Sequence, residues 1–270
     1  MPGVQPWREV GERVFVRRYR FYDQSIGAVV GAERVAVIDT RTTPSQAREL
    51  LADLRRLTDL PIVVVDTHGH YDHVFGNSIF RPAPIWGHLR CAEMIRRDGE
   101  RARAQLSAEA PELAAELGEV VLDPPDRTFE SSVSLDLGGP TIELRHLGRG
   151  HTDNDIAVLA PGAAVVFAGD LLENGGTPYF GDGYPLEWPV TARALASLVT
   201  GVVVPGHGEP ADRAFAERQA DEFEALAALA RRVDRGELDV AAAAELAPYP
   251  AIEARRPLER ALAQLRGDLD

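Results

Sequence analysis

The chain has 270 residues, of which 45% are hydrophobic and 26% charged, a composition typical of soluble globular proteins. Its formal net charge of −13 disfavours broad contact with phosphate backbones, so we expect no nucleic-acid partner. The single cysteine, Cys91, excludes an intrachain disulfide and favours a cytoplasmic location. We find neither a secretory leader nor an apolar run of about 18 residues, and we therefore expect no membrane attachment.

The N-terminal part of the sequence predicts strands followed by a helix. Short apolar stretches separated by turn residues predict a meander over residues 14–20, 26–31 and 34–39. Thr43 and Pro44 then have the character of an N-cap and a first helical residue, and leucines with helical spacing follow them. The β-branched run at residues 62–65 predicts a strand buried on both faces that leads directly into His68.

The rest of the chain alternates in the same way. Residues 88–117 predict one or two helices, broken near Asp98-Gly99 and Pro111, and a second set of strands is expected from near Val120. Further strands are predicted at 141–147, 156–160, 164–168 and 202–204, and a helix at 215–235. Short helices are expected around Pro248 and Pro250. We interpret residues 1–270 as one domain with a C-terminal helical segment from about 211 to 270.

Residues able to bind metal follow several of these strands. Residues two apart in an extended segment project to the same side, so His68 and His70 can bind one metal ion together. Asp72 and His73 fall on the turn that leads away and can reach a second ion. The remaining ligands for two ions are distant in sequence: His151, Asp170 and His207. Imidazole and carboxylate ligands without thiolate favour two zinc ions, although iron or manganese would also suit them.

These motifs resemble those of the metallo-β-lactamase superfamily. The resemblance spans roughly residues 10–210 and is carried by four segments: His68-Gly69-His70-Tyr71-Asp72-His73, Gly150-His151-Thr152, Ala168-Gly169-Asp170 and Pro205-Gly206-His207-Gly208. It implies an α/β (α+β) fold arranged as a four-layer αββα sandwich. It also implies a first metal held by His68, His70 and His151, a second metal held by Asp72, His73 and His207, and a bridging role for Asp170.

The bridging residue and His70 narrow the expected chemistry. Asp170, where true β-lactamases carry Cys or Ser, resembles the glyoxalase II and lactonase branch. His70, where flavodiiron oxygen reductases usually carry Glu, favours zinc-type hydrolysis. We therefore expect a zinc-dependent hydrolase that cleaves a small-molecule ester, thioester or lactone by a metal-bridged hydroxide. Asp72 is the expected catalytic residue, which orients that hydroxide and relays its proton.

Other functions remain open at this stage. A similar His-x-His-x-Asp-His run occurs in persulfide dioxygenases that use one iron, two metals can also serve a phosphodiesterase, and a non-catalytic sensor could use the same fold. Residues 175–178 do not resemble the Cys-Gly-Arg-type stretch of glyoxalase II, and residues 171–176 lack the tyrosine of the lactonases. The sequence thus leaves the substrate and the oligomeric state open.

Several further residues are candidates for supporting roles. Polar neighbours of the motifs are expected to orient the histidine rings: Asp66, Thr67, Thr152 and Asn154. Aromatic residues after Asp170 are expected to line a substrate pocket: Tyr179, Phe180 and Tyr184. A structural role is expected for His88, which begins a helix, for His146, which lies in a strand, and for Cys91.

Overall fold

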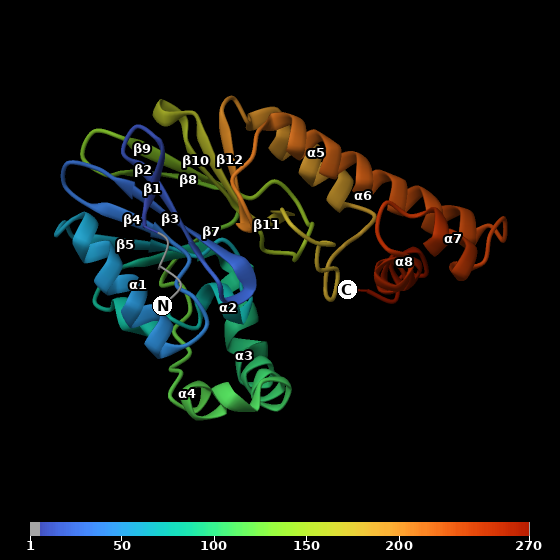
Figure 1. Cartoon of the computed structure of the whole chain (residues 1–270), viewed down its shortest axis with the longest axis horizontal. Helices are drawn as coiled ribbons and strands as arrows, with labels where there is room; N and C mark the ends of the chain where they lie inside the picture. The colour runs from blue at the N-terminus through green and yellow to red at the C-terminus, as the bar shows by residue number, and fades with distance from the viewer. Residues whose placement is uncertain (1–5, 270) are drawn as a thin grey trace.

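Two facing halves of one β-sheet form the centre of the molecule (Figure 1). The computed structural model describes residues 6–269. The strands of the N-terminal half are β1 (Arg8–Gly11), β2 (Val14–Tyr19), β3 (Gln24–Val30), β4 (Val35–Ile38), β5 (Ile62–Val65), β6 (Ile85–His88) and β7 (Arg127–Phe129). Those of the C-terminal half are β8 (Ser132–Asp136), β9 (Thr141–Arg145), β10 (Ala157–Ala160), β11 (Val165–Glu173) and β12 (Val202–His207).

The order of the strands explains how one sheet forms two layers. Hydrogen bonds connect the strands in the order β7-β6-β5-β4-β3-β12-β11-β10-β9-β8, with β2 also paired to β3 and β1 to β2. β3 and β12 pair through one residue pair, Gln24 with His207, and the sheet folds over at this point. We call this junction the seam. The inner faces of the two halves bury one shared apolar core, in which Ile38 and Val65 lie with Leu144 and Phe167.

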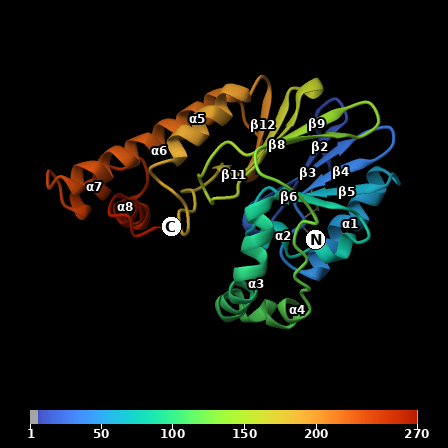
Figure 2. The ribbon, with the colours of Figure 1, turned by 180° about the vertical axis from the view of Figure 1, so that it is seen from behind.

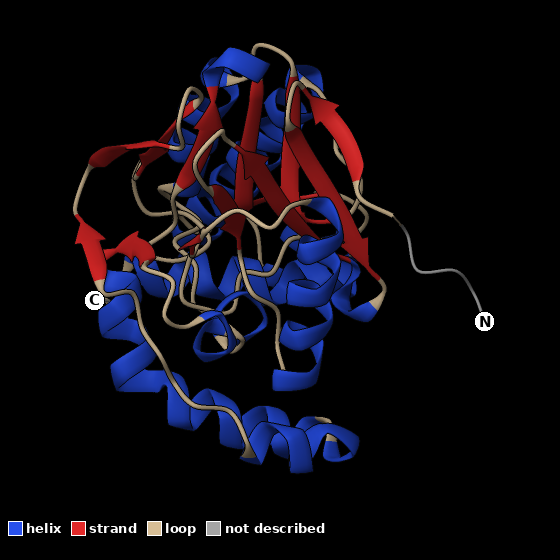
Figure 3. Cartoon of the chain, turned by 90° about the vertical axis from the view of Figure 1, so that its left-hand side faces the viewer, coloured by secondary structure: helices blue, strands red, loops and turns tan. Residues whose placement is uncertain are grey.

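Helices cover the outer faces of both halves. Their bounds are α1 (Pro44–Leu57), α2 (Tyr71–Val74), α3 (Leu89–Glu109), α4 (Ala114–Gly118), α5 (Trp188–Leu198), α6 (Arg213–Asp234), α7 (Val240–Leu246) and α8 (Ala251–Leu265). α1 lies on one side of the strands and α5 and α6 lie on the other, as the view from behind also shows (Figure 2). When the chain is coloured by type, the strands lie in the upper part of the view and most of the helices lie behind or below them (Figure 3). The expected αββα sandwich is confirmed.

Local chemistry accounts for the first helix. The side chain of Thr43 accepts a hydrogen bond from the backbone N–H of Gln46, and Pro44 occupies the first helical position, as predicted. Leu50 and Leu54 are fully buried against the outer face of the N-terminal half. Burial of each such leucine stabilises the fold by about 1.5–3 kcal/mol relative to leaving it exposed. The predicted meander is confirmed as β2, β3 and β4, which pair antiparallel.

The predicted helix break at Asp98-Gly99 is wrong, because α3 continues through it to Glu109. Gly99 permits close packing there, since a Cβ atom at this position would lie 2.8 Å from Cδ1 of Leu122. The strand expected near Val120 is also wrong. Val120 packs against α3 instead, and Pro124 and Pro125, which cannot donate ladder hydrogen bonds, precede β7. The break near Pro111 and the helix at 215–235, observed as α6, are confirmed.

The C-terminal helices pack on one another and on the outer face of the C-terminal half. Phe223 of α6 and Leu258 and Ala261 of α8 are fully buried in the same apolar cluster as Val203 of β12. The prediction of short helices around Pro248 and Pro250 is confirmed, because α7 ends at Leu246 and α8 begins at Ala251. Among the helices of residues 6–269, none is long and apolar enough to cross a membrane.

Candidate metal centre

The candidate ligands lie together at one end of the sheet, beside the seam. His68 and His70 follow β5, which is paired parallel to β4 and β6. Asp170 lies within β11 and His207 is the last residue of β12, the parallel neighbour of β11. Because parallel strands point their carboxyl ends to the same edge of a sheet, these side chains converge although they are far apart in sequence. His151 joins them from the loop between β9 and β10.

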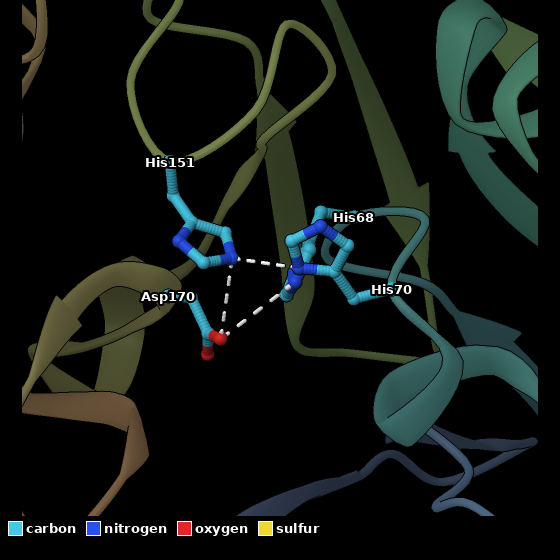
Figure 4. A group of neighbouring side chains, drawn as sticks. All are labelled: His68, His70, His151 and Asp170. Carbon is cyan, nitrogen blue, oxygen red and sulfur yellow. Dashed lines mark hydrogen bonds and ion pairs between the residues drawn. The ribbon is translucent and has the colours of Figure 1, made fainter. Parts of the chain in front are cut away.

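Four of these residues form a first cluster, which we call the His68 group: His68, His70, His151 and Asp170 (Figure 4). Each offers one ligand atom, and these atoms all lie within 4.8 Å of one another. Nε2 of His151 is 2.8 Å from Nδ1 of His70 and 3.4 Å from Oδ2 of Asp170, and Nε2 of His68 is 3.7 Å from the same oxygen. The cluster could therefore hold one metal ion.

The other three residues form a second cluster, which we call the Asp72 group: Asp72, His73 and His207. Nε2 of His73 and Nε2 of His207 each lie 3.4 Å from Oδ2 of Asp72. Asp170 faces this group as well, because its Oδ1 is 3.3 Å from Nε2 of His73 and its Oδ2 is 3.3 Å from Nε2 of His207. The carboxylate of Asp170 thus lies between the two groups.

Close approach of the backbone makes room for that carboxylate. A Cβ atom on Gly206, in the strand next to Asp170, would lie 1.8 Å from Oδ1 of Asp170. Any side chain at position 206 would therefore displace the residue that connects the two groups. This observation gives a physical reason for the glycine in the Pro205-Gly206-His207 motif.

Unpaired polar atoms support a fit to metal ions. Among the described residues, Nε2 of His68, Nε2 of His73 and Oδ1 of Asp170 are buried without a hydrogen-bond partner. Leaving such an atom without a partner costs about 1–3 kcal/mol, a cost that ligation of a cation removes. Burial, followed by the charge of His73, lowers the pKa of His68 well below its usual value. His68 therefore stays neutral, which is the form that binds metal.

Hydrogen bonds at the opposite ring nitrogens fix which atom of each histidine faces the site. His151 Nδ1 donates to the carbonyl of Tyr179 at 3.0 Å, and His207 Nδ1 donates to the carbonyl of Tyr22 at 2.6 Å. Because a carbonyl only accepts, each ring carries a proton on Nδ1, and Nε2 is the ring atom that faces the site. The rings are thus already oriented with Nε2, the candidate ligand atom, toward the site.

Carboxylates hold two more rings in the same way. His73 Nδ1 donates to Asp39 at 2.8 Å, and His70 Nε2 donates to the two oxygens of Asp182 at 3.0 and 3.1 Å. With Nε2 of His70 turned to Asp182, Nδ1 is the ring nitrogen that faces His151 and the site. Sequence reasoning missed both carboxylates. Asp39 had a signal, because it ends a predicted strand as the later ligands do, whereas Asp182 had none.

The expected supporting residues have different contacts. Thr67 donates its hydroxyl to Asp39 and lies 3.1 Å from Nδ1 of His68. Asn154 accepts from the backbone N–H of Gly69, between the first two histidines, at 2.9 Å. The other two candidates have hydrogen-bond partners away from the histidines: Asp66 accepts from Asn77, and Thr152 donates to Asp155.

A cavity of about 930 Å³ opens above both groups. Its walls come from α3, from α8 and from the segment after β11, and Asp72, Asp170 and His207 are among the residues at its surface. Tyr179 and Tyr184 line it, and Tyr179 is 47% exposed.

Phe180 requires a correction, because it does not line the cavity. Its side chain is 2% exposed and packs against Trp188, Phe223 and Tyr249 in the apolar cluster under α6. Its neighbour Tyr179 points the other way, so adjacent residues of one loop serve the core and the cavity separately. The aromatic character of the segment did not distinguish these two environments.

The residues assigned a structural role lie outside both metal groups. The rings of His88 and His146 stack with their centroids 4.3 Å apart, and each donates to a backbone carbonyl, of Glu130 and Asp155 respectively. His88 is the N-cap of α3, and its Nδ1 accepts from the backbone N–H of Arg90. Cys91 is fully buried, and burial raises the pKa of its thiol.

This chain is similar in sequence to one family profile and to several known proteins. The sequence profile of the Metallo-beta-lactamase superfamily matches residues 19–207. An acyl-coenzyme A thioesterase, MBLAC2, of Gallus gallus is 25% identical over 224 residues, covering 74% of this chain and 79% of that protein. A metallo-beta-lactamase type 2 of Bacillus cereus is 27% identical over 166 residues, covering 59% and 55% respectively. Metallo-beta-lactamase domain-containing protein 1 of Xenopus laevis is 32% identical over 155 residues, covering 54% of each chain. This chain spans about half the length of the last two relatives.

Solved structures share the fold. DIM-1 metallo-β-lactamase aligns with a TM-score of 0.64 and 21% identity, covering 82% of this chain and 99% of that one. A metallo-β-lactamase from Pontibacter korlensis aligns with a TM-score of 0.63 and 22% identity, covering 81% and 98% respectively. Since the family profile matches well over half of the chain, from before the first ligand to His207, this chain belongs to the metallo-β-lactamase superfamily, a superfamily of metal-dependent hydrolases.

Proposed function

We propose that this chain hydrolyses a small-molecule ester, thioester or lactone with two bound metal ions, both zinc. The observation that carries the proposal is the position of Asp170. Its carboxylate oxygens lie 3.3 to 3.7 Å from ring nitrogens of both the His68 group and the Asp72 group. A shared carboxylate and a donor set of imidazole and carboxylate without thiolate suit a zinc pair.

Asp72 is the proposed catalytic residue. Divalent metal ions bound here would polarise a carbonyl group and lower the pKa of water. Asp72 lines the cavity, and although burial alone would raise its pKa, His73 and His207 hold the pKa of Asp72 well below its usual range. The carboxylate is therefore ionised and can only accept hydrogen bonds. In our proposal it orients the nucleophilic water and carries a proton to the leaving group.

The cavity and one relative support the substrate class. A volume of about 930 Å³ lies within the range of about 300–1,000 Å³ that is usual for small-molecule sites. The MBLAC2 relative, which aligns over 74% of this chain, is named as an acyl-coenzyme A thioesterase, and this supports the thioester among the three bond types. We assign Tyr179 and Tyr184, which line the cavity, to contact with the substrate.

The test combines a metal count with a substrate panel. We expect about two zinc ions per chain and turnover of at least one ester, thioester or lactone, with phosphodiesters as the comparison. The control variant is His146→Gln, which removes a histidine outside both groups and should keep both metals and turnover.

Three results would overturn the proposal. A single iron with oxygen consumption on a sulfur substrate would identify a dioxygenase, and turnover restricted to phosphodiesters would identify a phosphodiesterase. If two zinc ions bind and none of the substrates is turned over, the hydrolase assignment fails while the metal centre stands.

A further inference from the structure

The segment between β11 and α5, residues 174–187, which we call the site loop, contacts two of the three histidines of the His68 group. The carbonyl of Tyr179 accepts from His151 Nδ1, and the carboxylate of Asp182 accepts from His70 Nε2. These bonds leave His151 Nε2 and His70 Nδ1, 2.8 Å apart, as the ring nitrogens that face the site. The position of the site loop therefore decides where both of these ring nitrogens point.

One face of α8 runs along this loop. Four residues of α8 form hydrogen bonds with the site loop: Glu253, Arg256, Arg260 and Gln264. They are three, four and four positions apart, so they lie on one side of the helix. Their partners follow in the same order along the loop: Thr177, Tyr179, Asp182 with Gly183, and Leu186 with Glu187. Hydrogen bonds thus connect the helix to the site loop from Thr177 to Glu187.

Arg260 makes the contact nearest to the metal ligands. Its Nε donates to the carbonyl of Gly183 and its terminal nitrogen donates to the carbonyl of Asp182, each at 2.8 Å. No carboxylate pairs with this guanidinium among the residues the structure describes, so both bonds to the loop are charge-assisted bonds to backbone. The planar fork holds two consecutive carbonyls at once and so fixes the peptide that carries the Asp182 side chain.

Two further contacts and the core make α8 a firm support. Gln264 accepts from the backbone N–H of Leu186 at 2.9 Å and donates to Glu187 at 2.9 Å. On the opposite face of the helix, Leu258 and Ala261 are fully buried in the cluster that includes α6. Because α8 is fixed to this core, its hydrogen bonds restrain the site loop. The helix lies beyond residue 207, where the match to the family profile ends.

We propose that α8 is part of the metal centre: Arg260 and Asp182 are positioning residues that hold His70 Nδ1 and His151 Nε2 toward the ion of the His68 group. The inference rests on the proposed metal centre. It predicts that damage to the contact between α8 and the loop weakens one metal site and spares the other, because His73 and His207 of the Asp72 group are held by Asp39 and Tyr22 instead.

The test measures zinc affinity by competition with a chromogenic chelator. The variants are Arg260→Ala and Asp182→Asn. The matched control is Arg255→Ala, which replaces an exposed arginine of the same helix that makes no side-chain hydrogen bond or ion pair within residues 6–269. We expect about 10- to 100-fold weaker binding of one zinc equivalent in the first two variants. The second equivalent, and both equivalents in Arg255→Ala, should match wild type.

Two further measurements keep the test decisive. If Arg260→Ala does not fold, Arg260→Lys replaces it. Lysine keeps the charge but lacks the planar guanidinium that donates to two carbonyls at once. In the metal-free protein, ¹⁵N NMR of the imidazoles should show His70 protonated on Nε2 in wild type and Arg255→Ala, and a mixture of tautomers in Asp182→Asn.

The results separate this inference from the proposed function. Unchanged affinity of both zinc equivalents in Arg260→Ala or Arg260→Lys would overturn the role of α8, and equal weakening of both sites would do so too, since that is the mark of general destabilisation. If wild type binds no metal, the proposed centre itself fails.

Discussion

Replacing Asp39 with asparagine tests how the Asp72 group is held ready for a metal ion. Asp39 is 1% exposed and accepts three hydrogen bonds: from the backbone N–H of Thr67 at 2.8 Å, from its hydroxyl at 2.9 Å and from His73 Nδ1 at 2.8 Å. Its backbone has a φ of 67°, a conformation that asparagine tolerates well, so the substitution perturbs the hydrogen bonds rather than the chain.

The magnitude follows from the number of acceptors. Asparagine offers one oxygen and one NH₂ group, so either Thr67 N–H or His73 Nδ1–H must face a second donor. A buried donor without an acceptor costs about 1–3 kcal/mol of unfolding free energy. His73 can relieve this cost by moving its proton to Nε2, but that atom faces Asp170 at 3.3 Å and is the candidate ligand. We therefore expect zinc affinity at this site to fall about 10- to 100-fold.

Two measurements check this prediction. Urea denaturation with a chelator present gives the unfolding free energy of the metal-free protein, and chelator competition gives the zinc affinities. Asp221→Asn, which changes an exposed aspartate of α6, is the matched control. If Asp39→Asn and Asp221→Asn have the same unfolding free energy and the same two zinc affinities, the argument from donors and acceptors is wrong.

Three other predictions follow from the site and its surroundings. Asp72→Ala and His151→Ala should each abolish turnover while circular dichroism shows an intact fold, and full turnover in either would refute the ligand assignment. Burial and His146 lower the pKa of His88, so the folded state binds fewer protons than the unfolded chain. The contribution of His88 to the unfolding free energy is therefore fully present above pH 6.5 and declines as the pH falls below it. His88→Gln should reduce this pH dependence in urea titrations. An unchanged pH dependence would contradict it. Tyr179→Ala should raise KM and keep both zinc equivalents, and an unaltered KM would remove this residue from the substrate contacts.

Local sequence signals predicted the elements that local chemistry controls. Thr43 and Pro44 begin a helix because a hydroxyl can cap it and a proline fits its first turn. The run at residues 62–65 forms a strand buried on both faces because only apolar β-branched side chains meet the layers on either side. The seven candidate ligands gathered into two groups because strand ends of one sheet share an edge, which the order of strands and motifs already implied.

The errors arose where a distant contact decides the outcome. Gly99 continues a helix because Leu122 packs on it, and Phe180 belongs to the core because Trp188 and Phe223 surround it. Asp182 lies 112 positions from His70, so no spacing rule could connect them. A single sequence carries no direct information on such pairs, because each residue type is compatible with several environments until the chain is folded.

A metal ion bound beside the seam would hold the two halves of the sheet together. One residue pair, Gln24 with His207, joins the two halves of the sheet in the ladder. The ligands are divided between these halves, with His68, His70, Asp72 and His73 on one side and the other three on the opposite side. An ion shared by ligands from both sides acts as a cross-link between segments that are distant in the sequence; His70 and His151, for example, are 81 positions apart. Metal removal should therefore loosen the junction before either half unravels, and hydrogen exchange should rise first in the backbone around Gln24 and His207.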